Sequence, residues 1–308
     1  MWKMISGIFL GWTLGSNDSA NIFGTGVAAN VIRYRTAIWL ITVFVILGAL
    51  AEGDKCFDSL GGLASLTPLE AFWVAMSAAI TMFGLTYLAL PCSTSQAIVG
   101  AILGASLIAG MPDFHKLYKI VLCWVLTPVS SVLIGMILYH FIGIIMMRSD
   151  IGPRGRSFFV FAGLIVAGCF GAYALGSNNV ANVTGVYVGS GLLTPFEGAL
   201  VGSLSIAIGV LTYSRKVMKT VGKKITYLDE YAAFIAELAA AITVEIFTQV
   251  GVPVSTSQAI VGGVVGVGLV KGARTISHRT LVGIGVGWIS TPLLAGTLSL
   301  TMLSITRQ

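Results

Sequence analysis

Charged side chains are scarce in this sequence. Of its 308 residues, 10% are charged and 56% are hydrophobic, and the mean hydropathy is +0.92. A soluble domain carries about 25% charged residues, so this chain cannot cover a water-facing surface. Apolar stretches recur along the whole chain, and several reach or approach the roughly 20 helical residues that cross a bilayer. The composition therefore predicts a polytopic membrane protein and excludes a soluble one.

Residues that hold metals or carry out redox chemistry are also few. The four cysteines, Cys56, Cys92, Cys123 and Cys169, form no CxxC pair, and the three histidines show no ligand spacing. These spacings argue against a zinc site and against a disulfide framework. The hydrolase motifs HExxH and GxSxG do not occur either. We therefore expect a protein that is not an enzyme and that needs no bound cofactor.

The net charge of +6 comes largely from short basic clusters between the apolar runs. They lie at 33–35, 148–156, 215–224 and 271–279. This distribution indicates membrane topology and not a nucleic-acid-binding surface. By the positive-inside rule these connections are cytoplasmic, which places 13 of the 18 Lys and Arg residues inside. We expect a multi-pass protein of the cell inner (cytoplasmic) membrane with both termini outside the cytoplasm.

The sequence repeats itself once. PCSTSQAIVG at 91–100 returns as PVSTSQAIVG at 253–262, SNDSAN at 16–21 returns as SNNVAN at 177–182, and WVLTP at 124–128 returns as WISTP at 288–292. Landmarks that keep their order and spacing over half a chain indicate internal homology. We therefore expect a first repeat at 1–147, a short basic cytoplasmic linker at 148–156 and a second repeat at 157–308.

Each repeat contains about five hydrophobic segments. They lie at 4–30, 36–51, 68–90, 91–110 and 117–147, and again at 157–190, 194–213, 229–250, 252–270 and 280–305. Because five is odd, the second repeat enters the membrane from the opposite side, as in many secondary transporters. The predicted fold is an all-α polytopic membrane protein with two inverted-topology repeats and broken or re-entrant helices.

The fourth segment of each repeat is ambiguous. Both 91–110 and 252–270 begin with proline and serine and are rich in glycine, which fits a full crossing or one arm of a re-entrant hairpin. A hairpin is expected to need a compensating extra crossing. A break at 127–128 in the long fifth segment is the candidate for it.

The SNDSAN element places Asp18 inside the first apolar segment. A carboxylate there costs at least about 2.5–3.5 kcal/mol and is normally paired with an ion or a proton. The nearby glycines suggest an interrupted helix, whose free carbonyls can ligate Na⁺. The alternative is a structural hydrogen bond between helices. The candidate cation ligands are Asn17, Asp18, Asn21, Asn178, Asn179 and Asn182. Because Asn179 replaces Asp18 in the second repeat, the two sites are expected to be unequal.

The PxSTSQ motifs suit an anion. Proline and Ser/Thr favour a helix N-terminus, which carries a partial positive charge and free N–H donors. Ordinary N-capping is the alternative interpretation. The candidate substrate contacts are Ser93, Thr94, Ser95, Gln96, Ser255, Thr256, Ser257 and Gln258. No Lys or Arg lies within these motifs, so the balancing charge is expected from helix ends and a co-bound cation.

Glu237 and Glu245 lie eight residues apart in the third segment of the second repeat, close to one helical face. Their counterparts in the first repeat are Ala75 and Phe83, so they break the symmetry. They are candidates for a second cation site, a proton relay or a subunit contact, and Glu237 is the stronger cation ligand.

The two paired motifs resemble the signatures of the inorganic phosphate transporter (PiT) family. SNDSANIFGT at 16–25 is similar to the family's GANDxANxxGT, and PxSTSQAIVG is similar to its PVSTTHxIVG, once per repeat. The resemblance covers nearly the whole chain. It implies a Na⁺- or H⁺-coupled symporter that holds inorganic phosphate between its repeats and, in many members, forms a homodimer.

Carried onto this chain, the resemblance places the cation on Asp18 with Asn17 and Asn21, and phosphate on 93–95 and 255–257. Gln96 and Gln258 replace a frequent family histidine, which removes one proton carrier. The alternatives are a permease for sulfate or another oxyanion and, further away, a channel or an intramembrane enzyme. Phosphate can donate a hydrogen bond at neutral pH and sulfate cannot, so a phosphate site should contain an acceptor. Na⁺ is expected as the co-transported ion in preference to H⁺.

Overall fold

The computed structural model describes residues 2–28, 31–88, 92–149, 152–224, 228–272 and 278–306, and every element assigned there is helical. Pro91 and Arg274, from a motif and a basic cluster above, lie outside these residues. The first repeat contains η1 (Trp2–Met4), α1 (Ile5–Asp18), α2 (Ala20–Ala28), α3 (Tyr34–Glu52), η2 (Gly53–Cys56), α4 (Phe57–Gly61), α5 (Pro68–Tyr87), α6 (Thr94–Ala109) and α7 (Phe114–Arg148). The second contains α8 (Pro153–Gly189), α9 (Pro195–Lys224), α10 (Glu230–Val250), α11 (Thr256–Lys271) and α12 (His278–Thr306).

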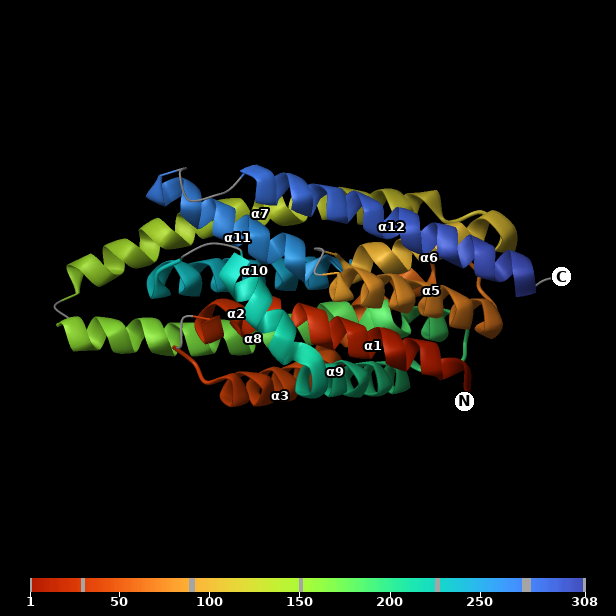
Figure 1. The fold of residues 1–308 in the computed structure, drawn as a ribbon, viewed down its shortest axis with the longest axis horizontal. Helices are drawn as coiled ribbons and strands as arrows, with labels where there is room; N and C mark the ends of the chain where they lie inside the picture. The colour runs from red at the N-terminus through yellow and green to blue at the C-terminus, as the bar shows by residue number, and fades with distance from the viewer. Residues whose placement is uncertain are drawn as a thin grey trace.

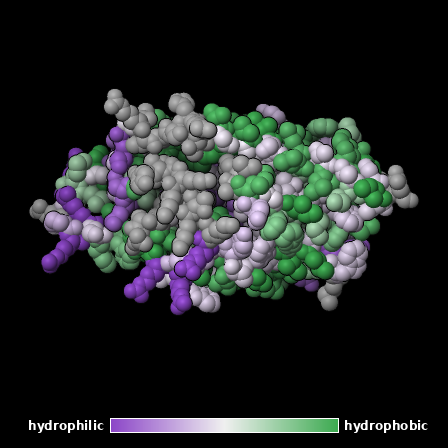
Figure 2. Space-filling view, viewed as in Figure 1, coloured by the Kyte–Doolittle hydropathy of each residue, from purple (hydrophilic) through white to green (hydrophobic). Residues whose placement is uncertain are grey.

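The helices have the length and composition of a membrane protein. Within the described residues, 7 helical stretches are long and apolar enough to cross a bilayer. Large apolar side chains are exposed along α7 and α12, such as Ile137 and Leu293, and Figure 2 shows hydrophobic side chains over much of one face, with hydrophilic ones gathered towards one end. The prediction of an all-α polytopic membrane protein is therefore confirmed.

Helices α5 and α6 form one hairpin, and α10 and α11 form another. The N–H of Asp113, just after α6, donates to the carbonyl of Leu63, just before α5, at 2.8 Å. In the second hairpin, Asp229 before α10 forms an ion pair with Lys271 at the end of α11. Partial burial of Asp229 opposes ionisation, but Lys271 and the N–H of Ala232 hold the pKa of its carboxyl below its ordinary value. Each hairpin thus begins and ends on the same side of the protein.

The two hairpins point at each other. In Figure 1, α5 and α6 lie towards the end that carries both chain termini, whereas α10 and α11 lie towards the opposite end. Helices α6 and α11 have 16 residues each, so they are about 24 Å long and shorter than the hydrocarbon core of about 30 Å. The ambiguity about the fourth segments is resolved in favour of re-entrant hairpin arms.

The expectation of a compensating extra crossing is wrong, because replacing two crossings by a hairpin leaves the number of crossings odd. A hairpin makes no net crossing, so each repeat crosses three times: through α1–α2, α3 and α7, or through α8, α9 and α12. Three is odd, as five is, and the inversion of the second repeat is preserved. Helix α7 accordingly continues through Pro128 without a break.

The first helix is interrupted and its counterpart is not. Helix α1 ends at Asp18, Ser19 separates it from α2, and α8 runs unbroken through the equivalent residues 177–182. The interruption is slight, because Ser19 keeps helical dihedral angles (φ -57°, ψ -26°), and it falls before the glycines at which the sequence predicts it. The repeats therefore differ in backbone at the position where they also exchange Asp18 for Asn179.

The repeats interlock through close helix contacts. Helix α6 packs against α12 and α11 against α7, so each hairpin is held by the other repeat. A Cβ on Gly100 would lie 2.3 Å from the carbonyl oxygen of Pro292, and one on Gly262 would lie 2.5 Å from that of Pro128. The Thr-Pro elements of α7 and α12 thus form the surface against which α6 and α11 pack.

Adding a methyl group at either contact should destabilise the protein. We expect Gly100→Ala and Gly262→Ala each to lower the free energy of unfolding by about 1–3 kcal/mol through overpacking. The two variants should lower the thermal unfolding midpoint in detergent to a similar extent as each other. Gly84→Ala is the matched control, because a Cβ there meets nothing within 4 Å. An unchanged midpoint for Gly262→Ala would show that the helices do not approach this closely.

Candidate functional site

The N-termini of α6 and α11 meet at the interface between the repeats. The Ser95 hydroxyl donates to the carbonyl of Val254 at 2.8 Å, and the Ser257 hydroxyl donates to the carbonyl of Cys92 at 3.3 Å. These pairs are related by a shift of 162 residues, so the same hydrogen bond is made twice in opposite directions. The two PxSTSQ motifs therefore face each other across a pseudo-two-fold axis.

The first serine of each motif caps its helix. Ser93 Oγ accepts from the N–H of Gln96 at 3.4 Å, and Ser255 Oγ accepts from the N–H of Gln258 at 3.3 Å. Ser255 Oγ also lies 2.8 Å from Ser257 Oγ. The N-capping interpretation of the motif thus holds for these two serines. Their caps leave the hydroxyl and amide groups that follow available for other partners.

Buried polar atoms without a hydrogen-bond partner gather around these helix ends. Most buried polar groups in proteins are paired, so such a cluster needs a reason. Among the described residues the unpaired atoms include Ser19 Oγ, Thr94 Oγ1, Gln96 Oε1, Asn179 Nδ2, Asn182 Oδ1, Thr256 Oγ1 and Gln258 Oε1. They comprise both donors and acceptors and come from both repeats. The arrangement can bind a small polar ligand that both donates and accepts.

Asp18 lies beside this cluster. Its side chain is only 3% exposed, Asn17 Nδ2 donates to its Oδ1 at 2.9 Å, and Thr256 is adjacent to the carboxyl group. Helix α1 ends at Asp18, and α2 begins one residue later, after Ser19. No ion pair reaches Asp18 within the described part of the chain. A buried carboxylate requires a cation or a proton, and half-buried Asn21 in the first turn of α2 is close in sequence.

Asn178 is fully engaged in fastening the second hairpin. Its Nδ2 donates to Thr248 Oγ1 at 3.0 Å and to the carbonyl of Val252 at 3.1 Å, and its Oδ1 accepts from the N–H of Val254 at 2.7 Å. These bonds tie α8 to the connection between α10 and α11. Asn178 therefore positions the tip of that hairpin, and its amide oxygen already accepts one hydrogen bond there.

Asn179 brings an unpaired donor to the cluster, and Asn182 brings an unpaired acceptor. Asn182 Nδ2 donates to Asn179 Oδ1 at 2.7 Å and to Ser95 Oγ at 3.0 Å. The oxygen of Asn179 that corresponds to the Asp18 carboxylate is thus already used, and its unpaired atom is the Nδ2 donor. A free N–H suits an anion, whereas the Asp18 carboxylate suits a cation.

Glu237 lies apart from the helix tips. It is 2% exposed, and neither carboxyl oxygen has a partner. The adjacent Ala236 packs against Gly263 of α11, which is seven residues, or about 10 Å, beyond Thr256 along the helix. The structure therefore places Glu237 near Cys169 of α8 and does not add it to the Asp18 cluster.

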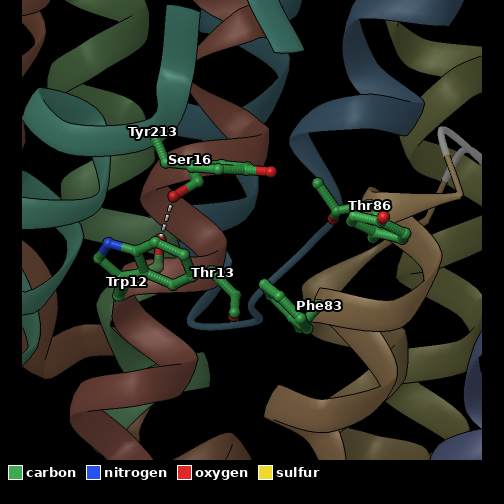
Figure 3. Close-up of a pocket in the computed structure, with 7 residues that line it drawn as sticks. Trp12, Thr13, Ser16, Phe83, Thr86 and Tyr213 are labelled. Atoms are coloured by element: carbon green, nitrogen blue, oxygen red, sulfur yellow. Dashed lines mark hydrogen bonds between the residues drawn. The ribbon is translucent and has the colours of Figure 1, made fainter. Parts of the chain in front are cut away.

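A small cavity opens next to the Asp18 end of the site. It has a volume of about 10 Å³ and is lined by Trp12, Thr13, Ser16, Phe83, Thr86, Tyr87 and Tyr213. That volume is about the least that holds a water molecule. Figure 3 shows side chains of α1 facing those of α5 across it, with Tyr213 of α9 above them. Sequence reasoning missed this cavity because aromatic residues in apolar segments resemble ordinary lipid-facing positions.

The fold and the paired half-helices define a membrane transporter. A model of the phosphate transporter family matches residues 14–161 and again 153–299, and the chain belongs to that family. A relative from Methanocaldococcus jannaschii named "Putative phosphate permease" is 30% identical over 293 residues, covering 95% of this chain and 93% of the relative.

Two other similarities bear on substrate and fold. The "Sulfate permease CysP" of Bacillus subtilis is 27% identical over 308 residues, covering 97% of this chain and 85% of the relative. A solved structure described as "The sodium-dependent phosphate transporter" superposes with a TM-score of 0.87 at 23% identity, covering 99% of this chain and 98% of that one. At that identity the likeness establishes the fold.

Proposed function

We propose that this protein is a secondary active transporter that carries inorganic phosphate together with Na⁺ across the cytoplasmic membrane by alternating access. The observation that carries the proposal is the meeting of two helix N-termini beside a buried carboxylate without an ion-pair partner. The N-termini favour an anion, and Asp18 favours a cation. Because no Lys or Arg lies in the tips, a co-bound cation supplies the charge that balances the anion.

The ligands divide between the two ions. Phosphate contacts are proposed for the two motifs, with Thr94, Thr256, Gln96 and Gln258 as direct partners and Ser93, Ser95, Ser255 and Ser257 forming the helix ends. The Na⁺ site is proposed on Asp18 with Asn17 and Asn21. In the second repeat, Asn179 and Asn182 face the anion and Asn178 positions the tip. Glu237 is proposed as a separate cation or proton site.

Phosphate fits the unpaired acceptors better than sulfate does. Gln96 Oε1, Gln258 Oε1 and Asn182 Oδ1 are buried without a donor, and a protonated phosphate oxygen can donate to one of them. Sulfate has no proton to give at neutral pH, so it would leave one more buried acceptor unpaired than phosphate does, at a cost of about 1–3 kcal/mol. The sulfate permease relative makes sulfate the second candidate.

The known relatives and the charge pattern agree with this assignment. The name of the archaeal relative supports phosphate, and the sodium dependence of the structurally similar transporter supports Na⁺. Both chain ends lie at one end of the molecule, opposite the α7–α8 connection with Arg148 and Arg154. By the positive-inside rule that connection is cytoplasmic and both termini are outside. The homodimer implied by the family resemblance stays a prediction.

The proposal is tested by uptake of radiolabelled phosphate into proteoliposomes under an imposed Na⁺ gradient, an H⁺ gradient or neither. We expect uptake with the Na⁺ gradient that excess unlabelled sulfate does not suppress. Uptake driven only by the H⁺ gradient would show that H⁺, and not Na⁺, is the coupling ion. Uptake fully displaced by sulfate, or no uptake under any gradient, would contradict the assignment of phosphate.

A further inference from the structure

The residues around the small cavity have counterparts in the other repeat. A shift of 161 or 162 positions relates Trp12 to Tyr173, Ser16 to Ser177, Phe83 to Glu245, Tyr87 to Gln249 and Tyr213 to Glu52. The same shift of 161 positions also relates two close helix contacts. A Cβ on Gly209 would lie 2.1 Å from the carbonyl oxygen of Trp12, and one on Gly48 would lie 2.0 Å from that of Tyr173. The two groups therefore occupy equivalent places in the inverted repeats.

The first group, Trp12, Phe83, Tyr87 and Tyr213, is called the inner cluster. The ring centroids of Trp12 and Phe83 are 6.2 Å apart, and those of Trp12 and Tyr213 are 5.5 Å apart. Trp12 Nε1 also donates to Thr212 Oγ1 at 2.8 Å. These contacts join α1, α5 and α9 across the cavity beside Asp18, as Figure 3 shows. The inner cluster is held mainly by apolar ring contacts.

The second group, Glu52, Tyr173, Glu245 and Gln249, is called the outer cluster. Gln249 Nε2 donates to Glu52 Oε2 at 3.1 Å and to Glu245 Oε1 at 2.5 Å, so one amide joins the two carboxylates. Tyr173 lies beside both. Lys55 pairs with Glu52 at 3.1 Å and donates to Gln249 Oε1 at 2.8 Å. This cluster joins α3, α8 and α10 by hydrogen bonds and charge.

The two clusters lie on opposite sides of the substrate site. Glu52 and Glu245 are half-buried, and charged groups within a membrane bundle favour water over lipid, so we place the outer cluster towards an aqueous side. It lies at the end of α3 that is followed by Lys55. The inner cluster lies towards the start of α3, because Ser214, next to Tyr213, bonds Tyr34 Oη at 3.0 Å. Arg215 stacks on the same Tyr34 ring at 5.7 Å.

We propose that the outer and inner clusters are the two gates of the transport cycle, one on each side of the site. The inference rests on the proposed function, since gates serve a transporter. In an inverted repeat, the two halves exchange conformations as access alternates, so equivalent clusters open in turn. The gates differ in chemistry. The outer gate closes through an amide bridge between two carboxylates, and the inner gate closes through contacts between tilted aromatic rings.

Two native cysteines report on the gates separately. Cys92 Sγ lies 3.8 Å from Thr86 Oγ1, which lines the small cavity. Cys56 follows in sequence Lys55, which contacts the outer cluster, and the Cys56 Sγ lies 3.8 Å from Asn178 Nδ2. Both are buried. With Cys123 and Cys169 replaced by alanine, a membrane-impermeant maleimide added to one face of oriented proteoliposomes labels only the cysteine that an open gate exposes.

The experiment compares two gate variants with a lipid-facing control. Phe83→Ala should raise labelling of Cys92 from the cytoplasmic face at least about fivefold, by enlarging the population with the inner gate open. Gln249→Ala should raise labelling of Cys56 from the outer face by a similar factor and leave Cys92 unchanged. Phe141→Ala on α7, where the ring is 62% exposed, should change neither.

Labelling does not require transport, so the two proposals fail separately. Sided labelling in a protein that takes up no phosphate would support the gates and overturn the substrate assignment. Labelling that rises at both cysteines in both variants, or at neither, would overturn the gates. If Phe83→Ala does not fold, Tyr213→Ala removes another ring of the inner cluster and must give the same sided result.

Discussion

Replacing Asp18 with asparagine should abolish Na⁺-driven phosphate uptake. The change keeps the shape of the side chain and removes the buried negative charge beside the hairpin tips, which makes the first repeat resemble the second at this position. Losing one partner of a buried ion pair costs about 3–5 kcal/mol, and each 1.4 kcal/mol is tenfold in affinity. Uptake at a Na⁺ concentration near the wild-type half-saturation should therefore fall more than about hundredfold.

Asp113→Asn is the matched control for this prediction. Asp113 is exposed, caps α7 by accepting from the N–H groups of His115 and Lys116, and lies far from the site in sequence. Asparagine caps helices about as well as aspartate, so uptake should be unchanged. If Asp18→Asn retained Na⁺-dependent uptake with an unaltered half-saturation, the cation would have to bind elsewhere, and Glu237 would become the leading candidate.

Removing the threonine hydroxyls at the hairpin tips should weaken phosphate binding from both repeats. Thr94 and Thr256 are buried; among the described residues the Thr94 hydroxyl has no hydrogen-bond partner, and the Thr256 hydroxyl faces the Asp18 carboxyl group. A hydrogen bond to a charged ligand contributes about 1.5–3 kcal/mol, so Thr94→Val and Thr256→Val should each raise the KM for phosphate roughly ten- to hundredfold. Valine preserves the shape of the side chain, so the expected loss is specific to the hydroxyl.

Thr81→Val on α5 tests whether the effect is local. The Thr81 hydroxyl is buried and donates to the carbonyl of Ser77 at 2.8 Å, so its loss changes no ligand contact. We expect its KM to match the wild type. Equal and small effects for all three variants would show that phosphate does not touch the tips. A large effect at Thr94 alone would show that only the first repeat binds it.

Much of the architecture can be predicted from the sequence because the two repeats share recognisable motifs. The returns of PxSTSQAIVG and SNxxAN fix the two halves, and the odd number of segments fixes their inversion. The hairpins could not be fixed in this way. Helix α5 has 20 residues and α10 has 21, which is enough to cross a membrane, and only the hydrogen bonds between the two hairpin tips, from Ser95 to Val254 and from Ser257 to Cys92, show that these hairpins end inside the protein.

The candidate site follows the same division. Asp18 and the PxSTSQ motifs stand out because polar groups are rare in apolar sequence. The roles of individual amides depend on tertiary contacts that no local pattern contains. Asn178 is a residue type that can ligate a cation, yet its amide makes three hydrogen bonds that fasten it to α10 and to the α10–α11 connection. Similarly, Glu52 and Glu245 are 193 positions apart in sequence and become partners only through the inverted fold.

The central claim is that a cation on Asp18 completes an anion site between the hairpin tips, and equilibrium binding tests it most directly. Binding of labelled phosphate to the purified protein should be measured while Na⁺ is varied at constant ionic strength, in the wild type and in Asp18→Asn. Coupled sites strengthen each other reciprocally, so Na⁺ should tighten phosphate binding in the wild type and have no effect in the variant. Phosphate binding that is equally tight with and without Na⁺ in the wild type would contradict the account.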